Sequence, residues 1–445
     1  MKTKVMLLAL ITSAIFAAPA AFSKDDASTA TLITGARIFD GISENLLEGQ
    51  DVLVKDGVIA QIAKDIDAPA GATVINAEGR VLTPGLVFMH EHLMMQLSSP
   101  DLLFRDDRYK AIVAGNIAED YLERGITTVR DASGNTYGLK AAIDDGQTPG
   151  PRIYPSGPMI SQTSGHSDHR FPTDKSVEMG GHHDLLVSEG DFVVADGVPE
   201  MLTATRENLR RGSSQIKIAV GGGTGSVSDP LEVVEFTDEE IQAATKAASD
   251  FGTYTMAHVY NNEGVRRAID NGVKSIEHGN LIDKDTLQYI KDQGDVWLSP
   301  QVSVYTFIPA GYTEGQAHKH HQAFEGIDHM FKTAKEIGFD KIVIGSDIIS
   351  NPEAIAKINE EFTFRAQWFS PIEVMRQATS KGGELLELSG VLNPYPGKLG
   401  VIAQGAHADL LLIDGNPLED LSVMTDHEAN FDLIMKGGEI YKSDL

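Results

Sequence analysis

His90-Glu91-His92 places two imidazole side chains directly after a short apolar stretch, Leu86–Met89. Alternate side chains of an extended strand share one face, so both imidazoles are expected to point the same way. Similar metal-binding groups end three further apolar stretches, at His258, His278 and Asp347. A lone His-x-His pair can be a surface coincidence. Here, further imidazole and carboxylate groups lie at the ends of other expected strands, and this repeated placement predicts a metal site instead.

Lys217 lies inside the apolar run Gln215–Val220, where a charged side chain needs an explanation. It could be a paired lysine, or one whose amine reaches out to solvent. Alternatively, neutral lysine reacts with CO2 to form a carbamate that can bridge two cations. A site of low dielectric near metal favours the neutral amine that this reaction requires. The histidines and the aspartate at the other strand ends favour this second interpretation.

Short apolar strands alternate with helical patterns through the middle of the chain. The expected strands are Leu86–Met89, Ile126–Arg130, Arg152–Ser156, Gln215–Val220, Tyr254–His258, Ser275–His278, Val296–Ser299 and Lys341–Gly345. The clearest helices are Thr237–Phe251, Asn262–Asn271, Asp283–Gln293 and Ile327–Ile337. This alternation predicts an α/β fold, a (β/α)8 TIM barrel, whose catalytic groups lie at the carboxyl ends of the strands. Residues 160–208 are expected to form an active-site loop or an insertion.

Both ends of the chain have short strands with turn signals. The pattern of Asp51–Ile62, with Asp-Gly between two apolar runs, predicts a hairpin, and Thr31–Gly41 is a second hairpin-like piece. Strand-turn patterns recur in Ala408–Gly415 and Leu433–Tyr441. We therefore expect a small β-sandwich domain built from residues 24–83 and 395–445, joined to a barrel of residues 84–394.

Residues 1–23 have the pattern of a secretory signal peptide. Lys2 and Lys4 precede an apolar run, Val5–Ala21, that ends in small residues. An uncleaved membrane anchor is the alternative, although the run is short for a bilayer span. The pattern predicts a periplasmic or secreted protein that has no membrane contact after cleavage.

Composition narrows the possible partners. The formal net charge is −27, and such an acidic surface repels nucleic acid and anionic membranes. The chain has no cysteine, which excludes thiol chemistry. Barrels of this kind often associate, so we expect a homo-oligomer.

The order of these residues resembles the amidohydrolase superfamily, which comprises metal-dependent hydrolases with a (β/α)8 barrel and a small β-sandwich. The resemblance covers essentially the whole mature chain. It is carried by Pro84-Gly85-Leu86, His90-Glu91-His92, Lys217, His258, Glu277-His278-Gly279 and Gly345-Ser346-Asp347. Within the superfamily the chain is most similar to the prolidase-like branch, which includes metallo-carboxypeptidases, Xaa-Pro dipeptidases and ochratoxin-type amidohydrolases. The closer likeness rests on Ser161–Asp168, Ile216–Gly223 and Ala257–Asn261.

The resemblance implies a site with two divalent metal ions, for which zinc suits the ligands best. His90, His92 and Asp347 would hold the first metal. His258 and His278 would hold the second. Lys217, carboxylated by CO2, would bridge them together with a hydroxide.

The resemblance also implies the roles of further residues in cleaving an amide bond. The bridging hydroxide would attack the carbonyl, and Asp347 would carry its proton to the leaving amine. His166 would contact the substrate carbonyl or carboxylate, and Tyr260 would bind the C-terminal carboxylate. Arg170 could add a cationic contact in the His166 loop.

Two positions depart from the family pattern. The family commonly has Asp two residues before the first ligand histidine, and this chain has Phe88 there. That Asp supports the metal ligands, so metal affinity or orientation could differ. The branch usually reads Gly-His-Gly-Asp where this chain has Gly165-His166-Ser167-Asp168, which leaves the shape of the pocket open.

Other features have simpler interpretations. The glycine-rich run 221–226 lacks the ending of a phosphate-binding loop, so a flexible loop at the barrel mouth is expected. The histidines of 182–183 and 318–321 are expected to be exposed polar residues, and Met94-Met95 to be core. Tyr305 and Phe307 follow the seventh strand and either line the pocket or pack in the core.

The sequence therefore favours an exported enzyme that cleaves the C-terminal residue from dipeptides or N-acyl amino acids, including amides of the ochratoxin type. A lactonase, cyclic amide hydrolase or phosphotriesterase would use the same metal site. Tyr260 and His166, as groups that bind a carboxylate, favour the amide. A non-catalytic binding protein is disfavoured because the ligand set is intact.

A Lys217→Ala variant tests the carbamate. We expect it to lose bound metal and activity, because the bridging carboxylate is gone, and to recover part of both with small added carboxylic acids. Metal content and hydrolysis rate are the measurements. Full activity without added acid would remove Lys217 from the site.

Overall fold

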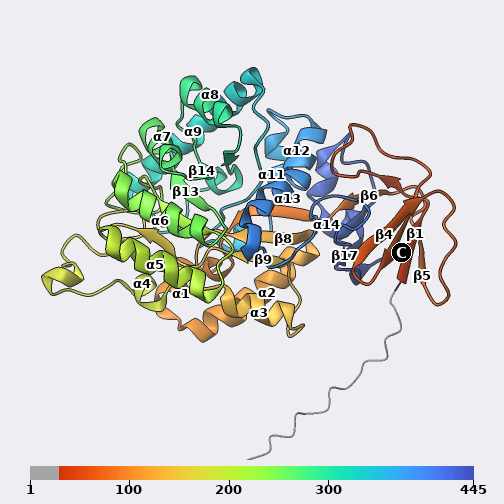
Figure 1. Cartoon of the computed structure of the whole chain (residues 1–445), viewed down its shortest axis with the longest axis horizontal. Helices are drawn as coiled ribbons and strands as arrows, with labels where there is room; N and C mark the ends of the chain where they lie inside the picture. The colour runs from red at the N-terminus through yellow and green to blue at the C-terminus, as the bar shows by residue number, and fades with distance from the viewer. Residues whose placement is uncertain (1–29) are drawn as a thin grey trace, which may run out of the picture.

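The computed structural model describes residues 30–445, so the predicted signal peptide lies outside the described residues. The described chain forms a large α/β part and a smaller part built of strands, at the right of Figure 1. No helix within residues 30–445 is both long enough and apolar enough to cross a membrane.

Two sheets form the small part. The first sheet has the order β4 (Val58–Ala63), β3 (Asp51–Lys55), β1 (Ala30–Thr34) and β5 (Thr73–Asn76). The second has the order β18 (Glu439–Ser443), β17 (Phe431–Lys436), β16 (Leu410–Ile413), β6 (Val81–Pro84) and β2 (Arg37–Ile38). Apolar side chains of both sheets, including Val52 and Leu412, pack into one core. Both ends of the chain therefore contribute to this part.

One of the two predicted hairpins is confirmed. β3 and β4 pair antiparallel around Asp56-Gly57, whose positive φ angles suit a tight turn. The hairpin predicted at Thr31–Gly41 is wrong, because β1 and β2 belong to different sheets. Gly35, with φ 68°, lets the chain pass from one sheet to the other between them.

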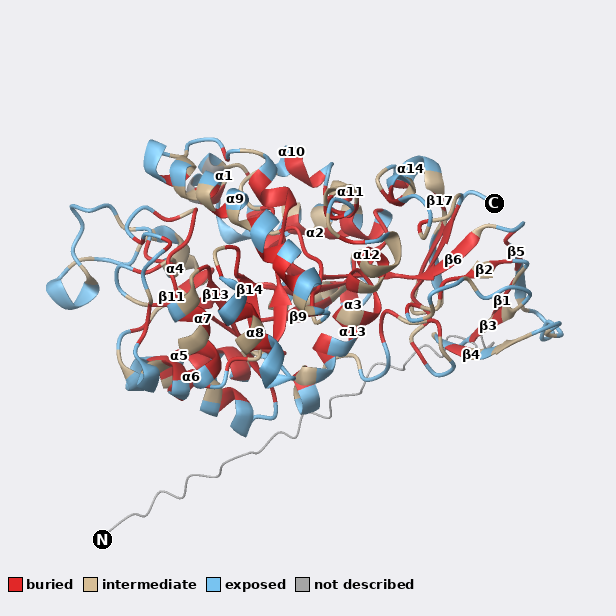
Figure 2. Cartoon of the chain, turned by 90° about the horizontal axis from the view of Figure 1, so that it is seen from above, coloured by how far each residue is buried: buried red, intermediate tan, exposed pale blue. Residues whose placement is uncertain are grey.

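Parallel strands form the centre of the large part. One group is β7 (Leu86–Glu91), β8 (Ile126–Asp131) and β9 (Arg152–Pro155). The other has the order β11 (Phe192–Val194), β10 (Met159–Ser161), β12 (Ile216–Ala219), β13 (Thr255–Val259), β14 (Ser275–His278) and β15 (Trp297–Ser299). Figure 2 shows most residues of these strands as buried. Burial on both faces explains why they read as continuous apolar runs.

Helices surround these strands (Figure 1). The longer ones are α2 (Asp107–Glu123), α3 (Tyr137–Asp144), α5 (Val198–Arg211), α6 (Asp238–Asp250), α7 (Asn262–Asp270), α8 (Lys284–Gln293) and α9 (Glu314–Ile337). The short ones are α1 (Ser99–Phe104), α4 (Leu185–Glu189), α10 (Pro352–Ile355), α11 (Glu360–Arg365), α12 (Pro371–Gln377), α13 (Ser380–Leu386) and α14 (His427–Asn430). The predicted α/β class is confirmed, and α6 begins with the expected capping box at Thr237.

α9 begins much earlier than the Ile327 predicted from the sequence. Thr313 and Gln316 form a capping box that starts the helix at Glu314. Its first half is rich in polar residues, so the apolar pattern alone missed it. The prediction that His320 is exposed is wrong, because helical spacing places it on the buried face with Gln316 and Ala323.

The predicted eighth strand, Lys341–Gly345, is not a strand. Its residues form one parallel bridge, Leu298 to Ile342. The segment still bonds to both neighbours: the Val343 amide donates to the Leu298 carbonyl (3.1 Å), and the Met89 amide donates to the Ile344 carbonyl (2.7 Å). The chain turns at Asp347, with φ 53°, before this segment can form a longer run of strand hydrogen bonds.

The segment between β10 and β12 is an insertion, as predicted. It contains α4, α5 and the edge strand β11, and part of it extends outward at the left of Figure 1. β11 pairs with β10, so the insertion adds a strand to the sheet.

A buried ion pair holds the segment near residue 343 in place. Arg365 and Glu361, both fully buried on α11, bond to each other at 2.7 Å. Arg365 also donates to the Val343 carbonyl (3.1 Å), and Glu361 accepts the Ser303 amide (2.7 Å). The pair thus ties α11 to the chain beyond β15 and to the segment beside β7.

An Arg365→Met variant should lower the free energy of unfolding by about 3–5 kcal/mol, because Glu361 would remain buried without its partner. Thermal and urea unfolding of the metal-free protein measure this change. The double variant Arg365→Met/Glu361→Gln should recover part of the loss, since it leaves no buried charge. A single variant as stable as the parent would contradict the assignment.

Candidate metal centre

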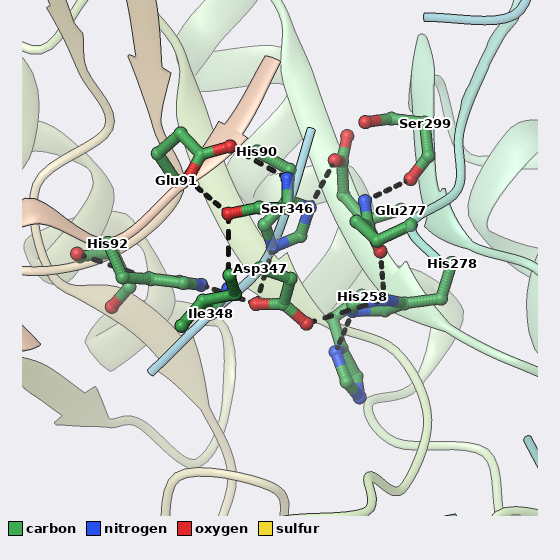
Figure 3. Close-up of polar contacts among 12 residues, drawn as sticks. His90, Glu91, His92, His258, Glu277, His278, Ser299, Ser346, Asp347 and Ile348 are labelled. Carbon is green, nitrogen blue, oxygen red and sulfur yellow. Dashed lines mark hydrogen bonds and ion pairs between the residues drawn. The ribbon is translucent and has the colours of Figure 1, made fainter. Parts of the chain in front are cut away.

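Asp347 joins the two histidines of the His-x-His motif. Its Oδ1 lies 3.4 Å from Nε2 of His90 and 3.0 Å from Nε2 of His92 (Figure 3). His90 belongs to β7 and His92 follows the last residue of that strand. The amide of Asp347 donates to the His90 carbonyl (3.0 Å), which holds the two segments together.

His258 and His278 form a second pair of imidazoles, at the ends of the neighbouring strands β13 and β14. Nδ1 of His258 lies 2.7 Å from Nε2 of His278, and Nδ1 of His278 lies 3.9 Å from Oδ2 of Asp347. Candidate ligand atoms of His90, His278 and Asp347 lie within 4.8 Å of one another. The structure therefore brings both predicted pairs into one buried cluster.

Lys217 is buried on β12, where Ala219 of the same strand lies opposite His258. Burial lowers the pKa of its amine to about 8, although Glu277 and Asp347 act to raise it. An amine that loses its proton this readily is suited to react with CO2.

The donor groups fit a divalent metal. Burial lowers the pKa of His92 and lowers those of His258 and His278 still further, so their imidazoles are neutral near neutral pH. Burial would raise the pKa of Asp347, but the facing His90 and His92 bring it well below its usual value. Neutral imidazole and ionised carboxylate are the forms that coordinate zinc.

Glu277 and Arg130 support His90 from the side opposite Asp347, and reasoning from the sequence assigned no role to either. Nδ1 of His90 lies 2.7 Å from Oε2 of Glu277 (Figure 3), which leaves Nε2 to face Asp347. Arg130 donates to both Glu277 oxygens at 2.7 and 2.8 Å, and both side chains are fully buried. A charged residue in the apolar strand Ile126–Asp131 was the signal that could have revealed this pair.

Phe88 occupies the position where the family commonly has Asp. Its ring is buried, with its centroid 6.3 Å from that of Phe362 on α11. The register of β7 against β8 shifts between Phe88 and Glu91. The carboxylate that orients His90 is therefore supplied by Glu277 on another strand.

Glu91 fixes the chain next to Asp347. Its carboxyl group accepts the Ser346 amide (2.7 Å), the Ser346 hydroxyl (2.6 Å) and the Tyr121 hydroxyl (2.8 Å). The middle residue of the motif thus points away from its two histidines. It connects β7 to the segment that carries Asp347.

His278 and Asp347 both adopt left-handed backbone conformations, with φ 71° and 53°. Non-glycine residues in this region cost roughly 1–3 kcal/mol, and such residues cluster at functional sites. Gly345 permits the close approach to β7, because a Cβ at this position would lie 2.7 Å from the His90 nitrogen.

Three of the predicted substrate contacts adjoin the cluster. The His166 ring stacks on the His258 ring, with centroids 3.9 Å apart. The Tyr260 ring stacks on His278 at 4.9 Å, and its hydroxyl lies 2.7 Å from the Tyr305 hydroxyl. The Tyr305 side chain is buried, and its hydroxyl lies 3.4 Å from Nδ1 of His278. Tyr305 therefore packs in the core and also contacts the site.

Arg170 is not brought into contact with the cluster. Its guanidinium donates to both oxygens of Asp168 at 2.7 and 2.5 Å. It lines a small pocket of the insertion together with Thr163, His182 and His183. Asp168 and Arg170 are only two positions apart in the sequence, which allows this local pair to form.

The glycine-rich run is packed against the site, contrary to the flexible loop that the sequence predicted. Gly221, Gly222 and Gly223 are buried. The Gly222 carbonyl lies 3.2 Å from Nε2 of His258, and a Cβ on Gly223 would lie 2.0 Å from the His166 ring. Glycine is needed here because the backbone runs directly along two imidazoles.

The chain belongs to the amidohydrolase family, whose family model matches residues 81–441. An amidohydrolase of solved structure is 32% identical, with a TM-score of 0.85, and covers 94% of this chain and 100% of its own. A prolidase solved with N-methylphosphonate-L-proline is 30% identical, with the same TM-score and coverage. Ochratoxinase from Aspergillus niger is 26% identical over 95% of this chain and 89% of its own length.

These similarities confirm the predicted superfamily and its branch of prolidase-like and ochratoxinase-like proteins. They also confirm the predicted enzyme class, a hydrolase acting on amide bonds.

A Glu277→Gln variant tests the support of His90. Metal affinity should fall by about 10- to 100-fold, because the buried carboxylate that orients the imidazole is lost. Competition with a zinc chelator measures the affinity, and thermal unfolding of the metal-free variant checks folding. Ser275→Ala, which removes one hydroxyl that donates to Glu277, is the matched control and should change affinity little. Unchanged affinity in Glu277→Gln would show that His90 needs no such support.

Proposed function

We propose that the protein is an exported hydrolase with two metal ions that removes the C-terminal residue from dipeptides or N-acyl amino acids, including amides of the ochratoxin type. The observation that carries this proposal is the pair of buried hydroxyls, Tyr260 and Tyr305, 2.7 Å apart beside His278. Hydroxyls at this position can bind a free carboxylate next to the reacting amide.

His90, His92 and Asp347 would hold one metal, His258 and His278 the other, and carboxylated Lys217 would bridge them. The bound metals, for which zinc suits the donors, would polarise the scissile carbonyl and make hydroxide available near neutral pH. The neutral buried imidazoles and the easily deprotonated amine of Lys217 support this assignment.

Asp347 would move the proton. Its Oδ1 faces His90 and His92, whereas its Oδ2 is 3.9 Å from its nearest ion-pair partner, His278. Oδ2 would take a proton from the attacking water and return it to the amide nitrogen as the carbon–nitrogen bond breaks. The product amine, which is the amino group of the released C-terminal residue, then leaves.

Tyr260 and Tyr305 would hold the substrate carboxylate. Burial raises the pKa of both phenols above the usual value, so both stay protonated and can donate. His166, stacked on His258, would lie against the substrate beside its carbonyl or carboxylate, where its Nε2 could accept a hydrogen bond from a substrate N–H. The prolidase and ochratoxinase relatives support a substrate of this class.

The remaining elements of the proposal concern the whole chain. The basic and apolar pattern of residues 1–23 supports export to the periplasm or outside the cell. The hydrogen bonds that residues 343–347 make to β15 and β7 support closure of the strands into a (β/α)8 barrel. The acidic composition supports the absence of a nucleic acid or membrane partner, and self-association is proposed because barrels of this kind often associate.

A substrate panel tests the activity. The mature chain, purified with zinc and bicarbonate, should hydrolyse dipeptides and N-acyl amino acids. The same compounds with a C-terminal carboxamide should react poorly, because they cannot offer a carboxylate to the hydroxyl pair. Activity confined to lactones, cyclic amides or phosphotriesters would overturn the proposal.

Tyr260→Phe should raise KM for substrates with a free carboxylate by about 10- to 100-fold, the value of a hydrogen bond to a charged group. It should change KM for carboxamide substrates little. Tyr289→Phe, which removes a hydroxyl bonded to Asp270 on the surface, is the control. Equal effects of Tyr260→Phe on both substrate series would exclude a carboxylate contact.

A further inference from the structure

His166 is held on two sides by groups that the proposed mechanism does not use. Its backbone amide donates to Oε1 of Glu235 (2.8 Å), a buried carboxyl on the chain before α6. Its Nδ1 lies 3.0 Å from the Ser226 hydroxyl and 3.4 Å from Oδ2 of Asp229. The ring is thus fixed at one edge while its face lies on His258.

Asp229 is a buried carboxylate with cationic and polar neighbours. Its Oδ2 accepts the Gly223 amide at 2.7 Å, and its Oδ1 lies 3.8 Å from Nζ of Lys319. Burial would raise its pKa, but His166, Ser226 and Lys319 bring it below the usual value. The group is therefore an anion beside the His166 ring.

Lys319 connects this anion to α9. Its Nζ donates to the carbonyls of Ser226 and Asp229, each at 2.9 Å. These two carbonyls lie three residues apart in the turn that carries Asp229, so the lysine fixes the conformation of this turn. The side chain is largely buried, with 13% of it exposed, which strengthens its interaction with the carboxylate.

The partners of Nδ1 decide where the His166 ring carries hydrogen. The Ser226 hydroxyl donates to the Gly223 carbonyl (3.2 Å), so its oxygen accepts from the ring. Ionised Asp229 can only accept. Both contacts therefore require hydrogen on Nδ1, and Nε2 has no hydrogen-bond partner within residues 30–445.

The backbone of Gly223 packs against the edge of the His166 ring. A Cβ on this residue would lie 2.1 Å from Nδ1 and 2.0 Å from Cε1 of His166. The backbone thus lies against the ring edge and cannot admit a side chain. The imidazole has little freedom to rotate between this backbone and His258.

We propose that Asp229 and Lys319 are positioning residues for His166: the buried carboxylate, held by the lysine of α9, keeps hydrogen on Nδ1 and turns Nε2 toward the substrate. The inference rests on the proposed function in so far as His166 meets the substrate. The orientation of the ring itself is independent of which substrate is bound.

Asp229→Asn tests the proposal, since an amide can donate where a carboxylate only accepts and so permits the other tautomer. In metal-free protein labelled with [15N]histidine, the His166 ring signal, assigned by its loss in His166→Gln, should move away from the Nδ1–H tautomer. In the zinc-loaded enzyme, kcat/KM should fall roughly tenfold or more while zinc content is unchanged. Asp409→Asn, which removes another buried carboxylate paired with a cation, should change neither.

Lys319→Met gives a second reading if Asp229→Asn folds poorly, and it should shift the same ring signal to a smaller extent. In the double variant His166→Gln/Asp229→Asn, the loss in kcat/KM should be no larger than in His166→Gln alone. An unchanged ring signal in both Asp229→Asn and Lys319→Met, or additive losses in the double variant, would overturn the proposal. Failure of the substrate panel with a shifted ring signal would instead refute the proposed function and leave the positioning role intact.

Discussion

The contact between Asp347 and β7 is the constraint on which the metal centre depends. The Asp347 amide donates to the His90 carbonyl, and the carboxylate then lies between His90 and His92. Glu91 holds the preceding residue, Ser346, by two hydrogen bonds. Because these groups come from opposite ends of the large α/β part, packing its first and last strand segments together also assembles the site.

Buried charges orient the site more than they stabilise the fold. A buried ion pair gains little net free energy, because the cost of desolvation offsets its attraction. Here each pair sets the direction of a neighbour: Arg130 holds Glu277, and Glu277 holds His90. Asp229 faces His166 in the same way. The result is a set of imidazoles whose free nitrogens are directed before any ligand binds.

Local patterns explain most of the agreement between the predicted and the observed fold. The runs around Ile126, Thr255 and Ser275 appear as strands because continuous apolar residues suit parallel strands covered on both faces. Two of the errors arose where tertiary contacts decided the outcome. Residues 341–345 pair with both neighbours but turn too soon to form a strand, and residues 31–41 divide between two sheets.

The sequence by itself determined the types and the order of the groups in the site, from His90 to Asp347. It also determined the apolar runs that deliver these groups to strand ends, because residue type and periodicity are local properties. Only the tertiary structure decided which group orients which. Glu277 lies 187 residues from the His90 that it holds, whereas Arg170 pairs with Asp168 only two residues away and leaves the site. No sequence pattern distinguishes these outcomes, because each depends on distances that exist only once the strands have packed together.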